Sequence, residues 1–198
     1  MANMMDYLDW RGDITMDRSP FNEVDNLILA QLAYLNFDYI VPPATSDESV
    51  TIREACERYF ALYDDETAAS LGYLIRVTAP LLKKLGDCPR FAEVRMGKFV
   101  NLIDLDQTKQ FSAVQYWLDD GTIYVAYRGT DNTIVGWKEN FHMSFTTPVP
   151  AQFEALRYLE DTAGESGAPL RIGGHSKGGN LAVYAAVKCR PAIRSRIL

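Results

Sequence analysis

A serine bracketed by two glycines, at residues 174–178, is the strongest candidate for a catalytic group. The segment reads Gly-His-Ser-Lys-Gly and stands between a short apolar run at 169–173 and an alanine-rich run at 180–187. This order predicts a strand, a tight turn and a helix, with Ser176 at the apex. Such a turn strains the serine backbone and needs small residues on both sides. The pattern therefore predicts a nucleophilic hydroxyl; a glycine-rich turn without chemistry is the alternative.

A second motif, at residues 125–131, ends a predicted strand with Arg-Gly-Thr. Open α/β sheets hold their ligands at the carboxyl ends of strands, where both motifs are expected. The backbone N–H groups of Thr130 and Lys177, with the Thr130 hydroxyl, are candidate donors to an oxyanion beside Ser176. Arg128 is better suited to anchor its loop through a salt bridge or carbonyl contacts than to touch a substrate. A plain turn at the strand end is the alternative interpretation.

The sequence contains two histidines, His142 and His175, and neither follows Ser176. Adjacent side chains on a tight turn point apart, so we expect His175 to be a structural residue packed under the turn. We expect His142 at the surface or in the wall of the site rather than as a general base. Trp137, Phe141 and His142 are candidates for a substrate pocket, although core packing explains the aromatic residues equally well.

The elements that must position these residues fall into two parts, an N-terminal helical lobe over 1–95 and an α/β core over 96–198. In the lobe, Ser19 and Pro20 suit the N-cap and first residue of a helix that Val41-Pro42-Pro43 stops. Further helices are predicted over 49–63 and about 66–85, the latter kinked or split near Pro80. The boundary between the two parts is expected near 90–97.

The core is predicted to combine strands and helices in the order of an α/β protein. Strands are expected at 99–104, 111–118, 122–127 and 170–172, with a hairpin turn at 119–121. An amphipathic helix is expected at 152–160, closed by Gly164 and Gly167. This order predicts a three-layer α/β/α core with helices on both faces of the sheet.

Taken together, the motifs resemble those of the class 3 lipase family of α/β hydrolases. The family's R-G-T, W-x-x-N/D-F and G-H-S-x-G-G motifs are similar to residues 128–130, 137–141 and 174–179 here, within a match over about 96–190. Residues 21–25 with 128–131 look like a bacterial branch of these lipase-like proteins. The resemblance implies an α/β-hydrolase-type core, an acyl-serine intermediate at Ser176, and oxyanion donors at Thr130 and Lys177.

The resemblance also implies an acid and a histidine that have no counterpart in residues 1–198, and we expect them after Leu198. The 198 residues alone should therefore hydrolyse p-nitrophenyl esters slowly or not at all. A hydrolase-fold protein that binds without turnover is the alternative from another class, and a thioesterase or peptidase would use the same groups. We also expect an open sheet edge beside residues 170–172, through which the chain could form homo-oligomers.

Composition restricts the partners and the compartment. Twenty Lys and Arg against 26 Asp and Glu give a net charge of −6, which disfavours nucleic acid as the main partner. Three scattered cysteines lack metal-ligand spacing, so we expect reduced thiols, no metal and no cofactor. The first residues contain no basic segment and no apolar run, so we expect no signal peptide, and no apolar run of the sequence is long enough to span a membrane. We expect a cytoplasmic protein that acts on a small-molecule or lipid ester.

Overall fold

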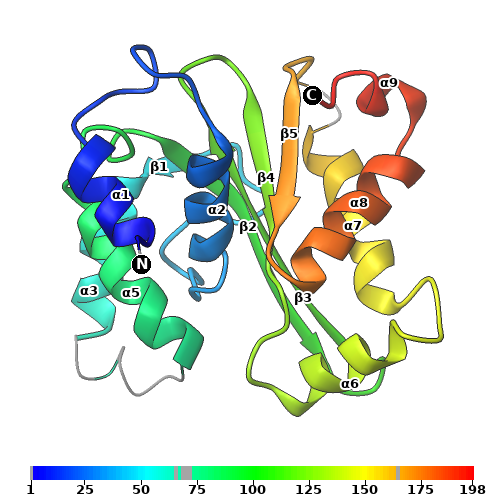
Figure 1. Ribbon diagram of the computed structural model, residues 1–198. Helices are drawn as coiled ribbons and strands as arrows, with labels where there is room; N and C mark the ends of the chain where they lie inside the picture. The colour runs from blue at the N-terminus through cyan, green and yellow to red at the C-terminus, as the bar shows by residue number, and fades with distance from the viewer. Residues whose placement is uncertain (1, 65–66, 68–72, 164–165) are drawn as a thin grey trace.

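The computed structural model describes residues 2–64, 67, 73–163 and 166–198 and contains a mixed five-stranded sheet (Figure 1). The strands are β1 (Ser49–Thr51), β2 (Arg95–Asp104), β3 (Lys109–Trp117), β4 (Ile123–Tyr127) and β5 (Leu170–Gly174). They lie in this order across the sheet. Neighbouring strands from β1 to β4 are antiparallel to each other, and β5 is parallel to β4. The predicted α/β class is confirmed at this level.

Helices cover both faces of the sheet (Figure 1). One face carries α1 (Met4–Arg11), α2 (Glu23–Leu32), α3 (Ile52–Leu62) and α5 (Tyr73–Gly86), and the other carries α7 (Pro150–Ala163) and α8 (Lys177–Lys188). The short helices α6 (Ile134–His142) and α9 (Pro191–Arg194) follow β4 and α8. Successive side chains of β4 point to opposite faces of the sheet and belong to two apolar cores: Tyr124 packs against α2, and Val125 packs towards α7 and α8. None of the helices in the described ranges is long and apolar enough to cross a membrane.

The first predicted helix begins and ends elsewhere in the structure. It was expected to start at Ser19 and Pro20 and to run to Val41, whereas α2 starts at Glu23 and ends at Leu32. Asn22 is the N-cap, and it forms a reciprocal capping box with the carboxylate of Asp25. The carbonyls of Ser19 and Pro20 instead accept hydrogen bonds from Arg90, at 2.9 and 3.3 Å.

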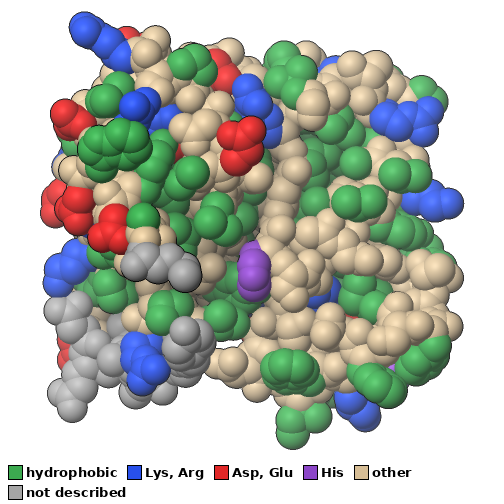
Figure 2. Space-filling model, in the orientation of Figure 1, with side chains coloured by type: hydrophobic (Ala, Val, Ile, Leu, Met, Phe, Trp, Pro, Cys, Tyr) green, Lys and Arg blue, Asp and Glu red, His purple; other side chains and the backbone are tan. Residues whose placement is uncertain are grey.

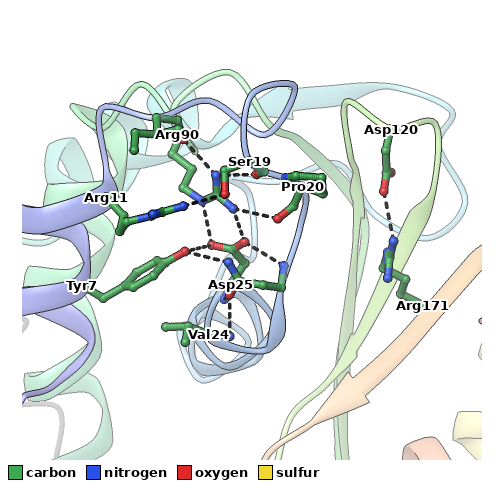
Figure 3. A network of polar contacts seen from close by, with 11 residues as sticks. Tyr7, Arg11, Ser19, Pro20, Val24, Asp25, Arg90, Asp120 and Arg171 are labelled. Atoms are coloured by element: carbon green, nitrogen blue, oxygen red, sulfur yellow. Dashed lines mark hydrogen bonds and ion pairs between the residues drawn. The ribbon is translucent and has the colours of Figure 1, made fainter.

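A buried ion pair stabilises this start of α2 (Figure 3). The guanidinium of Arg90 donates to both carboxylate oxygens of Asp25, and neither side chain is exposed. Tyr7 of α1 donates to the same carboxylate at 3.0 Å. Asp25 thus caps α2 and neutralises Arg90 at once, which fixes where α2 begins and joins it to α1, a helix that the sequence did not predict.

The predicted helix over 49–63 is a strand followed by a helix. Residues Ser49–Thr51 pair with β2, and Thr51 then caps α3 through a capping box with Glu54. The single-helix prediction was wrong because it overlooked this Thr-x-x-Glu signal. The helix predicted over about 66–85 corresponds to α5, and Pro80 lies inside it. Its predicted start before Tyr73 falls mainly outside the described residues.

The strands of the core agree with prediction to within a few residues at each end. The hairpin between β3 and β4 closes at Gly121, which has φ 80° and donates to Leu118 O at 3.0 Å. Helix α7 is longer than predicted, and Gly164, expected to close it, lies outside the described residues.

Strand β5 lies at one edge of the sheet. On its outer side, the chain after α9 returns and forms a parallel bridge between Leu170 and Ile197. Leu170 N donates to Arg196 O at 2.8 Å, and Leu198 N donates to Leu170 O at 2.9 Å. The first residue of β5 is therefore covered; self-association through the rest of this edge stays a prediction.

Candidate active site

Ser176 occupies the turn between β5 and α8. Its backbone has φ 57° and ψ −121°, which lies outside the helix and strand regions. A residue other than glycine in such a conformation costs about 1–3 kcal/mol, and strain of this kind clusters at functional sites. The predicted strained turn is confirmed, and Ser176 is exposed at its apex.

The glycines on either side of Ser176 are required because backbone meets backbone there. A Cβ on Gly174 would lie 2.5 Å from both Tyr127 O and Gly178 C. A Cβ on Gly178 would lie 2.9 Å from Tyr127 C and closer still to Tyr127 O. The end of β4 therefore lies directly against the start of α8, and a methyl group has no space at either position.

The loops that carry Thr130 and Lys177 emerge at the same end of the sheet. Strands β4 and β5 run parallel, with Tyr127 opposite Gly174, so both turns follow carboxyl ends. A Cβ on Gly129 would lie 2.5 Å from His175 O, which shows how closely the two loops approach. Lys177 is the first residue of α8, and such an N–H has no acceptor within its own helix. The Thr130 hydroxyl is buried and has no hydrogen-bond partner among the described residues.

Arg128 anchors the loop that carries Thr130. Its buried guanidinium donates to Asn101 Oδ1 at 2.8 Å and lies 3.5 Å from Asp131 Oδ2. Burial lowers the pKa of Arg128, and the charge of Asp131 opposes that shift. Asp131 also accepts from Thr133 N at 2.9 Å, just before α6. The predicted anchoring role of Arg128 is confirmed.

The side chain of Lys177 is buried and forms two hydrogen bonds. Its Nζ donates to Glu139 Oε2 at 2.7 Å and to Gln110 O at 2.6 Å. Burial lowers the pKa of Lys177, and Glu139 opposes this shift. Sequence reasoning did not single out Glu139; an acidic residue at a variable position of the 137–141 motif was the available signal.

His175 is held by a tyrosine from the N-terminal half of the chain. Its Nδ1 lies 2.9 Å from Tyr34 Oη, and Tyr34 is only 5% exposed. Burial raises the pKa of Tyr34 to about 12, so its hydroxyl is protonated at neutral pH. His175 itself is exposed, so the prediction that it packs under the turn was wrong.

A family model described as Mbeg1-like matches residues 85–198. The chain belongs to the Mbeg1-like family. The comparisons with curated proteins and with solved structures give no match. The Mbeg1-like region contains Ser176, the Thr130 loop and the Lys177–Glu139 pair, whereas Tyr34 precedes it. Among the described residues, no group of three or more His, Cys, Asp or Glu side chains is placed to hold a metal ion.

The predicted pocket residues of the Mbeg1-like region lie on α6, and two of them are exposed. Trp137 is 63% exposed and Phe141 68% exposed, so neither side chain is enclosed in a pocket. Hydrophobic side chains accordingly gather at the surface over α6 (Figure 2). The His142 ring packs near Phe145, with centroids 5.6 Å apart. A role for Trp137, Phe141 and His142 in substrate binding stays a prediction.

Proposed function

We propose that this member of the Mbeg1-like family is a serine hydrolase of the esterase or lipase type, with Ser176 as its nucleophile. The observation that carries the proposal is the strained backbone of Ser176, held between Gly174 and Gly178 where α8 meets β4. A strand, a strained serine and a helix in this order form the nucleophile elbow of α/β hydrolases. The parallel pairing of β4 and β5 supports a core of that type.

In the proposed reaction, Ser176 Oγ attacks the carbonyl carbon of a carboxylic ester while its proton passes to a general base. The oxyanion that forms accepts hydrogen bonds from the backbone N–H groups of Thr130 and Lys177. The positive end of the α8 dipole favours the same negative charge. The base then returns the proton to the departing alkoxide. Water hydrolyses the acyl-serine, which releases the carboxylic acid and regenerates the hydroxyl.

Hydrolysis of p-nitrophenyl esters by the natural protein at its full length tests the proposal. We expect Ser176→Ala to lower kcat by about 10³-fold or more. Ser195→Ala, at an exposed serine near the end of α9, serves as the matched control and should retain the rate. His142→Ala and His175→Ala should retain most of it, since neither histidine is assigned as the base. A Ser176→Ala variant with the wild-type rate would contradict the proposal.

A protein that binds its ligand without turnover is the second candidate. It is favoured because, among the described residues, no hydrogen bond joins Ser176 Oγ to a histidine or a carboxylate: His175 Nδ1 contacts Tyr34, and Asp131 pairs with Arg128 and accepts from Thr133. It predicts no ester hydrolysis and a thermal shift of the wild-type protein with unreactive ester analogues. A panel of oxygen esters, thioesters and peptides separates esterase, thioesterase and peptidase activity.

A further inference from the structure

We infer that the buried ion pair between Lys177 and Glu139 is a positioning device, which fixes the backbone N–H of Lys177 beside Ser176. This inference rests on the proposed function, because it assigns to the pair a role in holding one donor of the oxyanion hole. Neither side chain is proposed to touch the substrate.

Glu139 connects four elements through one carboxylate. Its Oε2 accepts from Lys177 Nζ at 2.7 Å and from Gln110 N at 2.9 Å, and its Oε1 accepts from Ala151 N at 2.7 Å. Lys177 Nζ also donates to Gln110 O at 2.6 Å. Both charged side chains are completely buried. The starts of β3, α7 and α8 are thus held against one residue of α6.

A lysine is an unfavourable choice at this position for stability alone. A cation near the N-terminus of a helix opposes the helix dipole, and burial of an ion pair carries a large desolvation penalty. Apolar side chains of similar volume often replace buried ion pairs without loss of stability. The pair instead fixes the position of Lys177. Two hydrogen bonds hold Nζ at one end of this residue, and its backbone N–H at the other end adjoins Ser176.

The test compares the rate at which a fluorophosphonate modifies Ser176 in the natural protein and in variants. Ser176 Oγ displaces fluoride from phosphorus, and the hydroxyl proton leaves through the base. For Glu139→Gln and Lys177→Met we expect the maximal rate, kinact, to fall about 10- to 100-fold, below the loss for complete removal of an oxyanion donor. KI should stay within about twofold, because the pair does not touch the probe.

The matched control is Glu154→Gln, which makes the same change in a different ion pair, one that is partly buried. Glu154 lies 2.9 Å from Lys109 and also pairs with Arg157, and its side chain is 14% exposed. This variant should lose some stability and keep the wild-type kinact. Circular dichroism checks that every variant is folded at the assay temperature.

The double variant Lys177→Met/Glu139→Gln separates positioning from stability. Lys177→Met alone leaves the buried carboxylate of Glu139 without a partner, and the double variant removes that charge. The double variant should therefore recover stability while kinact remains low. If Lys177→Met does not fold, the kinact values of Glu139→Gln and the double variant test the inference. Recovery of kinact in the double variant, or single variants that react like Glu154→Gln, would overturn the inference and leave Ser176 as nucleophile. An unreactive wild-type protein would overturn the proposed function and this inference together.

Discussion

Replacement of Gly178 by alanine probes the contact between β4 and the start of α8. The new Cβ would lie 2.9 Å from Tyr127 C, 3.0 Å from Arg128 C and closer still to Tyr127 O. All three are backbone atoms, so no change of rotamer relieves the overlap. Overpacking of this kind costs about 1–3 kcal/mol, and we take the upper end for a backbone contact. Alanine regains about 1 kcal/mol of helix propensity, which leaves a net loss of about 2 kcal/mol.

The adjacent Gly179 provides a matched control. A Cβ there would lie 3.1 Å from Gly174 O, a contact that a shift of a few tenths of an ångström relieves. We therefore expect Gly179→Ala to be neutral or to stabilise by up to about 1 kcal/mol. Urea unfolding followed by circular dichroism measures both free energies of unfolding, and Tm should fall by about 4–8 °C in Gly178→Ala. If Gly178→Ala is as stable as Gly179→Ala, the close approach described for this turn is wrong.

Three further predictions concern the same turn and its neighbours. Ser176→Gly should be about 1 kcal/mol more stable than Ser176→Ala towards urea, because glycine relieves the strain of φ 57°; equal stability would argue against that strain. The pKa of Tyr34 is raised to about 12 by burial, so its contribution to stability is complete below pH 10 and is lost as the pH rises towards 12. The stability advantage of wild type over Tyr34→Phe should thus shrink by about 1.4 kcal/mol between pH 9 and pH 11, and a constant difference would contradict the raised pKa. Gly129→Ala should destabilise the protein because its Cβ would overlap Tyr34 Oη and lie 2.5 Å from His175 O; Tyr34→Phe in the same chain should restore part of the loss, and strictly additive effects would refute the contact.

Local sequence patterns predicted the elements that carry the candidate site. The hairpin at 119–121, strand β5 and the turn at Ser176 depend on residues that are close neighbours in the chain, so their signals were complete. The start of α2 was missed because the prediction followed Ser19 and Pro20 and overlooked the capping residues Asn22 and Asp25. The capping box of Asn22 with Asp25 is a local signal, whereas its reinforcement by the guanidinium of Arg90, 65 residues from Asp25, lies beyond local rules.

The same limit applies to the surroundings of Ser176. Tyr34 and His175 are 141 residues apart, and Lys177 and Glu139 are 38 apart. No periodic pattern marks such pairs. A lysine and a glutamate within two neighbouring motifs were visible in the sequence, but their burial against each other depends on how α6 packs against β3, beside the start of α8. Trp137 and Phe141 were predicted to line a pocket; their exposure depends on packing that composition does not reveal.

The central claim is that Ser176 is an activated nucleophile, and covalent labelling tests it most directly. The natural protein is treated with a fluorophosphonate, digested, and the modified peptide is sequenced by mass spectrometry. The account predicts a single adduct on Ser176, absent from Ser176→Ala and blocked by prior heat denaturation. An intact, folded protein that carries no adduct, or that carries it on another serine, would contradict the claim.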